Sequence, residues 1–152
     1  SDITIDVTKN FHAVEHRIEK VDTIDGVVYY NDSKGTNTDA SIKAIKAMSR
    51  PTLLIAGGYD KNSPYDDFIE SFDGKIKELV LIGATAEKIK ACALEHGFTN
   101  IKMADSLEEA VSICKADSEN GDAVLLSPAC ASWDMFKSYE QRGRLFKDLV
   151  KG

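Results

Sequence analysis

Apolar residues follow two alternating spacings along this chain, and the alternation predicts an α/β protein. Short continuous apolar runs are typical of strands that are buried on both faces. These runs occupy 52–56, 78–83, 101–104 and 123–126. Between them, apolar residues recur every three or four positions, as on one face of a helix. This spacing predicts a first helix that contains Ile42, Ile45 and Met48 and stops at Pro51. Three more helices are predicted at 65–72, from Thr85 to near Gly97, and from Ser106 to Cys114. The last helix is predicted to start at Trp133 or Asp134 and to contain Phe136, Tyr139, Phe146, Leu149 and Val150.

A hairpin precedes this alternation. Asp25-Gly26 separates two β-rich runs, and a type I′ turn needs positive φ at both central residues, which favours this dipeptide. We expect an antiparallel pair of strands at about 18–24 and 27–31. Alternating strands and helices then give a parallel sheet with helices on both faces. The predicted fold class is therefore α/β, a Rossmann-like three-layer sandwich of about six strands, mostly parallel, with one antiparallel edge strand from the 18–31 hairpin.

Hydroxyl side chains begin several of the predicted helices. Thr36 and Ser106 each have an acidic residue three positions on, which is the spacing of a capping box. Thr85 and Ser132 are interpreted as further N-caps. Gly143 interrupts the last helix at a cost of about 1 kcal/mol relative to alanine, so we expect a packing or ligand reason for it.

The composition is that of one globular domain. The 152 residues are 43% apolar and 29% charged, which is enough for a sizeable core. Residues 1–10 have little periodicity and are interpreted as a linker remnant from an upstream domain, which leaves 11–152 as the domain. No apolar run approaches the length of a membrane span, so no membrane partner is expected.

Charge and cysteine content narrow the range of partners. A net charge of −6 with interspersed acids and bases argues against nucleic acid, and an anionic ligand must be held by local lysines and arginines. Cys92, Cys114 and Cys130 show no metal-ligand spacing, and an odd number of cysteines fits the reducing cytoplasm. We expect a cytoplasmic monomer that holds no metal.

Three of the predicted strands, 27–31, 52–56 and 123–126, end in polar turns. Ligands of parallel sheets bind beyond the carboxyl ends of the strands. We therefore expect these turns to converge. The last turn, 127–132, contains only small residues, which leave backbone N–H and hydroxyl donors free near a helix N-terminus and so suit an anion.

The first of these turns, Asn31–Asn37, has the densest set of candidate side chains. Asp32, Ser33, Lys34 and Thr36 together offer donors, acceptors and charge at a helix start. A ligand site fits this set. A helix cap beside a solvated lysine is the alternative.

Two further cations stand near strand ends. Lys61 follows Gly57-Gly58, but the segment lacks the pattern of a P-loop. Lys61 can therefore either bind a carboxylate of a ligand or simply lie in solvent. Arg17 can hold a phosphate with two hydrogen bonds. An exposed surface pair is the commoner explanation for His16 and Arg17.

Two catalytic alternatives receive little support. Cys130 with His16 as its base lacks a family-type signature around the cysteine. His12 and His16 have the i, i+4 spacing of metal ligands, but the local sequence offers no further ligand. Tyr139 fits a core better than a ligand platform, and Arg142 is interpreted as a tie between the last helix and its neighbours.

Four segments taken together resemble the C-terminal domain of the Mur ligases, the ATP-dependent enzymes that build the peptide of peptidoglycan. They are His16-Arg17-Ile18-Glu19, Asn31-Asp32-Ser33-Lys34-Gly35-Thr36-Asn37, Gly57-Gly58 with Lys61, and Leu126-Ser127-Pro128-Ala129-Cys130-Ala131-Ser132 followed by Asp134, Phe136 and Glu140-Gln141-Arg142-Gly143. They keep the family's order and spacing from about Phe11 to the end. The resemblance is strongest to the members that add D-glutamate to UDP-N-acetylmuramoyl-L-alanine.

The resemblance implies a division of the site between two ligands. In this family ATP phosphorylates the carboxylate of the UDP-linked substrate, and the amine of the incoming amino acid attacks the acyl phosphate. The domain then supplies positioning and no catalytic residue of its own. The resemblance places D-glutamate against Thr36, Lys61, Ser132, the backbone at Trp133, and Tyr139, and it places ATP against Arg17 near the phosphates, Asp32 near the ribose, and Lys34. Trp133 and Tyr139 depart from the smaller residue and the phenylalanine expected at these positions.

The resemblance also implies that the P-loop, the Mg²⁺-binding glutamate and the UDP-binding domain belong to other parts of a full-length ligase. ATP and Mg²⁺ are then cofactors of the full-length enzyme, neither is held by this domain alone, and the isolated domain is expected to be inactive. Two alternatives remain open at this point. One is a related ligase that adds a different amino acid, or glutamate to folate, and the other is a stand-alone module that binds an anion or a nucleotide.

Overall fold

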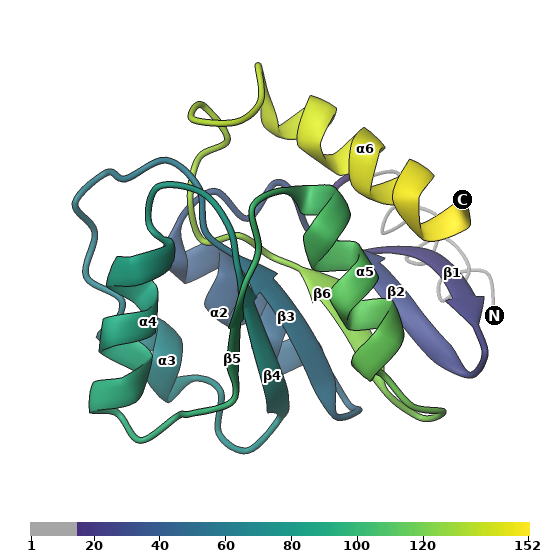
Figure 1. Ribbon diagram of the computed structural model, residues 1–152, viewed down its shortest axis with the longest axis horizontal. Helices are drawn as coiled ribbons and strands as arrows, with labels where there is room; N and C mark the ends of the chain where they lie inside the picture. Colours follow the sequence, from purple (N-terminus) through teal and green to yellow (C-terminus); the bar gives the residue numbers. More distant parts are fainter. Residues whose placement is uncertain (1–14) are drawn as a thin grey trace, which may run out of the picture.

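The computed structural model describes residues 15–152, which form a six-stranded sheet between two layers of helices (Figure 1). β1 pairs antiparallel with β2, and the other neighbouring strands are parallel. The strands are β1 (Glu19–Ile24), β2 (Val27–Asn31), β3 (Thr52–Ala56), β4 (Ile76–Leu81), β5 (Ile101–Met103) and β6 (Ala123–Leu126), in the spatial order β1-β2-β6-β3-β4-β5. The predicted fold class is confirmed, with the hairpin strand at one edge.

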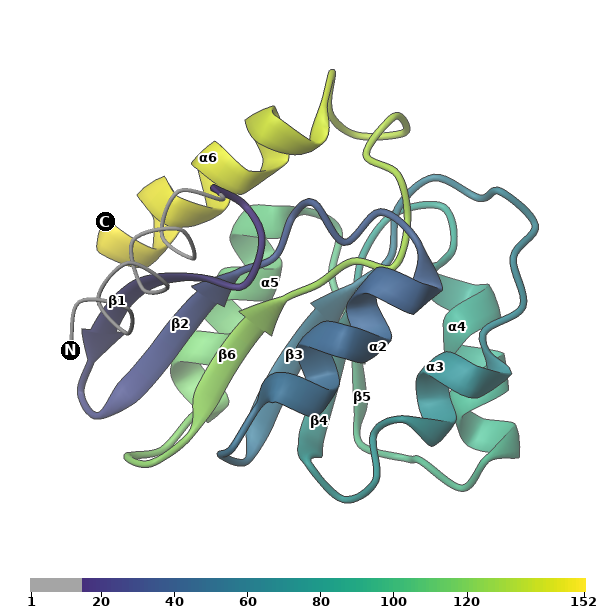
Figure 2. The ribbon, with the colours of Figure 1, turned by 180° about the vertical axis from the view of Figure 1, so that it is seen from behind.

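Different helices cover the two faces of the sheet (Figures 1 and 2). One core lies under α2 (Thr38–Ala47), α3 (Asp66–Glu70) and α4 (Ala86–Glu95), and the other lies under α5 (Leu107–Asp117) and α6 (Tyr139–Lys151). Along the central strands, Leu54 and Leu125 face the first core, and Leu53 and Val124 face the second. Both faces are buried, which is why these strands have continuous apolar sequences.

The last helix begins later than predicted. It starts at Tyr139, and its N-cap is Ser138, whose hydroxyl accepts a hydrogen bond from the Gln141 N–H at 3.1 Å. Ser138 and Gln141 have the spacing of a capping box, although the Gln141 side chain accepts from the Lys137 N–H and not from that of Ser138. The prediction placed the cap at Ser132 instead. Ser132 instead closes a single turn, in which its carbonyl accepts from Met135 and Phe136. The prediction of a start at Trp133 or Asp134 is therefore wrong.

Other predicted caps differ in detail. Asn37, not Thr36, caps α2, and its side chain accepts from the Ala40 N–H. Thr85 makes no capping bond, because its hydroxyl accepts from the Gly58 N–H at 3.0 Å. Ser106 caps α5 as predicted, accepting from the Glu109 N–H. α3 is shorter than the predicted 65–72.

Gly143 has the packing reason that its position in the last helix led us to expect. A Cβ at this position would lie 2.2 Å from Nδ1 of His16. α6 therefore approaches the imidazole ring closely only because residue 143 has no side chain. The proposed linker at 1–10 and His12 lie outside the described residues.

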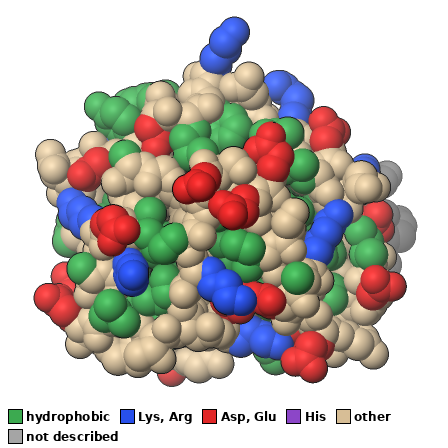
Figure 3. Space-filling model, viewed as in Figure 1, with side chains coloured by type: hydrophobic (Ala, Val, Ile, Leu, Met, Phe, Trp, Pro, Cys, Tyr) green, Lys and Arg blue, Asp and Glu red, His purple; other side chains and the backbone are tan. Residues whose placement is uncertain are grey.

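The described surface carries mixed charge and no membrane span. In the view of Figure 3, acidic and basic side chains are interspersed over the face that α5 and α6 cover. Within 15–152, none of the helices is long and apolar enough to cross a bilayer.

Candidate ligand-binding site

The three polar turns converge as predicted, because they follow the adjacent parallel strands β2, β6 and β3. Backbone hydrogen bonds connect them. The Ala129 N–H donates to the Gly35 carbonyl, the Gly57 N–H to the Pro128 carbonyl, and the Tyr59 N–H to the Ala131 carbonyl, each at 2.9 Å. The turns therefore form one connected frame along the carboxyl edge of the sheet.

Asp32 lies in the floor of this frame and is 3% exposed. One carboxylate oxygen accepts from the Ile18 N–H at 3.0 Å, and the other accepts from the Ser127 hydroxyl at 2.6 Å. Burial raises the pKa of Asp32 to about 6, against the opposing effect of these two hydrogen bonds. A Cβ at Gly35 would lie 2.7 Å from the Asp32 carboxylate, so the turn can close over this group only with glycine there.

Arg142 fastens α6 to the floor. Its guanidinium is 1% exposed and donates to the Ser33 hydroxyl at 2.9 Å, to the Ser33 carbonyl at 2.7 Å and to the Cys130 carbonyl at 3.1 Å. Burial lowers its pKa to about 10, which still leaves the group charged at neutral pH. The interpretation of Arg142 as a structural tie agrees with these contacts.

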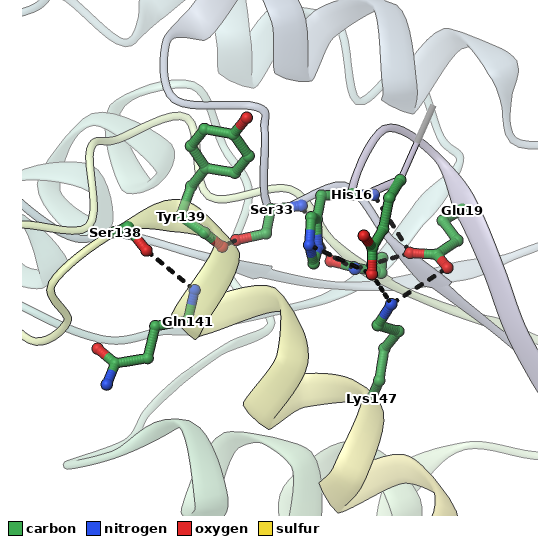
Figure 4. A network of polar contacts seen from close by, with 9 residues as sticks. His16, Glu19, Ser33, Ser138, Tyr139, Gln141 and Lys147 are labelled. Carbon is green, nitrogen blue, oxygen red and sulfur yellow. Dashed lines mark hydrogen bonds and ion pairs between the residues drawn. The ribbon is translucent and has the colours of Figure 1, made fainter. Parts of the chain in front are cut away.

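A second polar network lies behind the site (Figure 4). The Ser33 hydroxyl donates to the Tyr139 carbonyl at 2.7 Å. His16 is 2% exposed, and its Nδ1 lies 2.8 Å from Nδ2 of Asn31. Glu19 accepts from Asn31 at 3.1 Å and from Lys147 at 3.2 Å. These contacts fix the start of α6 relative to the turn after β2.

The interpretation of His16 and Arg17 as an exposed pair is right for Arg17 and wrong for His16. Gly143 leaves the space in which the imidazole ring packs, and a contact between residues this far apart in the chain leaves no local signal. Burial lowers the pKa of His16. Its carbonyl accepts from the Lys34 N–H at 2.9 Å, so His16 holds the backbone of a candidate site residue.

The five residues predicted to hold an amino acid line one pocket of about 230 Å³. Ser132 is buried, whereas Trp133 is 65% exposed and Lys61 is exposed. The Lys61 ammonium lies 5.9 Å from the centre of the Trp133 ring. The complete lining is Thr36, Lys61, Ala131, Ser132, Trp133, Lys137, Ser138 and Tyr139. Sequence reasoning missed Lys137 and Ser138, although the capping-box spacing at Ser138 was a signal for the second.

The three residues predicted to contact a nucleotide line a neighbouring pocket of about 350 Å³. It holds three cations and two carboxylates. Lys34 also lies 6.0 Å from the centre of the Tyr139 ring, so it stands between the two pockets. The complete lining is Arg17, Ile18, Asp32, Lys34, Gly35, Asn37, Asp39, Ala40 and Lys43. Lys43 and Asn37 were not predicted.

Cys130 lies under the frame and has the features of a structural thiol. It is 1% exposed, and its sulfur lies 3.3 Å from the Tyr65 hydroxyl and 3.4 Å from the Thr85 hydroxyl. Burial raises its pKa, which keeps the thiol protonated and unreactive.

The fold and the two pockets define a class: an α/β domain with pockets lined by cationic and hydroxyl side chains at the carboxyl edge of its parallel strands, where ligands of such sheets bind. The chain belongs to the Mur ligase family. The sequence profile described as "Mur ligase, glutamate ligase domain" matches residues 16–130.

Individual proteins agree with this assignment. The UDP-N-acetylmuramoylalanine--D-glutamate ligase of Lachnospira eligens is 60% identical over 149 residues, which are 98% of this chain and 33% of the relative. The chain thus spans about a third of the length of the curated relatives it matches.

Two solved structures show the same fold at low sequence identity. A UDP-N-acetylmuramate-alanine ligase from Thermotoga maritima has a TM-score of 0.63 and 13% identity, over 96% of this chain and 32% of that one. A bifunctional folylpolyglutamate synthase/dihydrofolate synthase from Yersinia pestis, complexed with AMPPNP and a manganese ion, has a TM-score of 0.61 and 14% identity, over 90% and 32% of the two chains.

Proposed function

We propose that residues 11–152 are the amino-acid-binding domain of an ATP-dependent ligase that adds D-glutamate to UDP-N-acetylmuramoyl-L-alanine. The observation that carries the proposal is the single pocket shared by Thr36, Lys61, Ser132, Trp133 and Tyr139, because three distant segments bring cationic and hydroxyl groups together there. A relative with 60% identity is named for this reaction.

The chemistry of the first pocket suits a small dicarboxylic amino acid. Lys61 and Lys137 offer two positive charges for two carboxylates, and Ser132 and Ser138 offer hydroxyl donors. Lys61 is exposed and makes no ion pair within the described residues, so its ammonium is available to a ligand. These groups fix the carboxylates and leave the amine to be aimed at an acceptor, which is catalysis by positioning.

The chemistry of the second pocket suits the phosphates of a nucleotide. Arg17, Lys34 and Lys43 line it, and an arginine can bind phosphate with two parallel hydrogen bonds. Asp32 already accepts two hydrogen bonds, but a carboxylate has about four lone-pair sites, so it can also accept from a ribose hydroxyl. Lys34 lies between the pockets and connects the nucleotide to the amino acid.

ATP supplies the phosphoryl group that activates the acceptor carboxylate. Mg²⁺ prefers oxygen ligands, chiefly carboxylates and waters. Only Asp32 and Asp39 bring carboxylates to the nucleotide pocket, and three cationic side chains beside them, Arg17, Lys34 and Lys43, oppose a bound cation. The cation is therefore held mainly by other parts of the ligase. We expect that ligase to act as a cytoplasmic monomer.

Steady-state kinetics of the intact ligase test the proposal. Lys61→Met should raise the KM for D-glutamate at least tenfold and change the KM for ATP much less, whereas Arg17→Met should do the reverse. Lys20→Met is the matched control, because Lys20 is an exposed lysine on β1 outside both pockets.

Competing substrates separate the proposal from its alternatives. D-Glutamate should be accepted in preference to L-glutamate and diaminopimelate. Preference for diaminopimelate, or addition of glutamate to folate, would assign the domain to another ligase of the superfamily. The 152-residue chain alone should show no ATP turnover in a coupled assay, and turnover there would contradict its role as one half of each site.

A further inference from the structure

A group of metal-ligating side chains lies on the α3 and α4 side of the molecule, outside both ligand pockets. Asp66 begins α3, and Cys92 and His96 lie four residues apart at the end of α4. One ligand atom from each of these three residues lies within 4.8 Å of the other two. The distance is 3.5 Å between the Cys92 sulfur and Oδ1 of Asp66, and 2.8 Å between that oxygen and Nε2 of His96.

We propose that Asp66, Cys92 and His96 form a site for a d-block dication such as Zn²⁺. Zinc bonds of about 2.0–2.3 Å in tetrahedral geometry place ligand atoms roughly 3.3–3.7 Å apart. The sulfur and the carboxylate oxygen already have this separation. The imidazole nitrogen, 2.8 Å from that oxygen, has to move away from it by about 0.5 Å. A thiolate, an imidazole and a carboxylate are the ligands zinc uses in proteins, and three of them leave a position for water.

The second nitrogen of His96 supports this assignment. Nε2 of His96 lies 2.8 Å from Asp66, and its Nδ1 lies 3.8 Å from a carboxylate oxygen of Glu70, so a small shift would bring Nδ1 within hydrogen-bond distance of Glu70. A metal-bound histidine usually directs its other N–H to a carboxylate, which sets the tautomer and the orientation of the ring. Glu70 lies four residues after Asp66 on the same helix, so α3 supplies both the ligand and this orienting group.

The charge around the group also favours a cation. Within residues 15–152, neither Asp66 nor Glu70 pairs with a lysine or arginine. Three ligands open to water, two of them on exposed residues, give the ion a path to the site.

A second histidine and carboxylate group shows the contrast. Glu15, His16 and Glu19 also lie close together, but the Lys147 ammonium binds both carboxylates there. Those carboxylates therefore already have a cation of the protein as their partner. Among the residues that the structure describes, no lysine pairs with Asp66 in the other site.

Co²⁺ titration of the reduced 152-residue chain tests the site, because Co²⁺ replaces Zn²⁺ and reports a bound thiolate by a charge-transfer absorption in the near ultraviolet. The wild type should develop this absorption at one equivalent, and excess Zn²⁺ should remove it. Cys92→Ser should abolish it. Glu95→Gln is the matched control, since Glu95 is exposed on α4 and is not a ligand, and it should leave the absorption unchanged.

Affinities measured by competition with a chelator sharpen the test. His96→Ala should weaken Zn²⁺ binding by more than roughly a hundredfold, and Glu70→Gln by roughly tenfold, as for a group that orients a ligand. Zn²⁺ should also protect Cys92 from alkylation, read by peptide mass in the wild type, so the result does not depend on any variant folding. No absorption at millimolar Co²⁺, absorption that survives Cys92→Ser, or alkylation of Cys92 that Zn²⁺ does not slow would each overturn the proposal.

Discussion

The floor and the rim of the candidate site are built in opposite ways. In the floor, Asp32 and Arg142 are buried and their polar atoms are bound to the protein. On the rim, Lys61 and Trp133 are exposed; the Lys61 ammonium lies 5.9 Å from the centre of the Trp133 ring, and that ring packs edge-on against Tyr59. The floor holds the three turns together whether or not a ligand is present, whereas the rim keeps its polar groups for a ligand. Substitutions in the floor should therefore act on stability, and substitutions on the rim should act on binding.

The largest loss of stability is expected for Arg142→Met. Hydrogen bonds from a charged donor contribute roughly 1.5–3 kcal/mol each, and the substitution leaves the Ser33 and Cys130 carbonyls unpaired in the interior. The free energy of unfolding, measured by urea denaturation, should fall by about 3–5 kcal/mol. Arg144→Met, at an exposed position of the same helix, should change it by less than about 0.5 kcal/mol. Equal effects of the two substitutions would show that the floor carries no special stability.

The carboxyl of Asp32 should give the floor a pH dependence. The folded protein keeps this proton up to about pH 6, whereas an unfolded chain releases it near 3.8. Ionisation in the folded state therefore costs free energy, and the contribution of Asp32 to stability falls by about 2–3 kcal/mol as the pH rises from 4 to 7.

Unfolding measured across that range in the wild type and in Asp32→Asn should show the effect as a difference between the two curves. The asparagine variant should lose less stability between pH 4 and 7. Asp39→Asn, at an exposed position of the nucleotide pocket, should follow the wild type. Parallel curves for Asp32→Asn and the wild type would mean that Asp32 ionises normally.

A smaller effect is expected where α6 packs on His16. Gly143→Ala gains about 1 kcal/mol of helix propensity but places a methyl group 2.2 Å from the His16 ring, and overpacking costs about 1–3 kcal/mol. The variant should be less stable than the wild type by up to about 2 kcal/mol. In a His16→Ala background the same substitution should become stabilising, because the contact at 2.2 Å is then gone and only Nδ2 of Asn31, at 3.1 Å, remains close. If Gly143→Ala changes the free energy of unfolding in the same direction in both backgrounds, contact with His16 is not the reason for the glycine.

The smallest effects on stability belong to the rim. Lys61→Met and Trp133→Ala should each change the free energy of unfolding by less than about 1 kcal/mol, because both side chains are exposed and make few contacts. Both variants should nevertheless weaken binding of D-glutamate in the intact ligase. A loss of several kcal/mol of stability would place these residues in the fold and remove the contrast between floor and rim.

Sequence reasoning succeeded where the signal was local or periodic. The strands from Thr52 and Ala123 were found because burial on both faces requires an unbroken apolar run. The cap at Ser106 was found because capping is a contact over three residues. The start of the last helix was misplaced because two serines, Ser132 and Ser138, offered competing starts. The Asp134 carboxylate instead accepts a hydrogen bond from the Ala84 N–H in another loop.

Side-chain burial at the site was beyond such reasoning. The residues on either side of His16 are typical of a surface segment. His16 is buried because α6 packs against it at Gly143, which is far away in the chain. The partners of Arg142 are a carbonyl twelve residues away and a serine 109 residues away. Cys92 and Asp66 likewise come from different helices, which the spacing of cysteines alone does not reveal.

By itself, the amino-acid sequence determined the order of strands and helices along the chain, the edge of the sheet at which the polar turns meet, and the residue types available there. It could do so because periodicity, turn chemistry and strand direction are local properties. The tertiary structure alone decided which of those polar groups form hydrogen bonds within the protein and which remain available to a ligand. The physical reason is burial. Segments far away in the chain exclude water from Asp32 and Arg142, whereas Lys61 and Trp133 stay in contact with water.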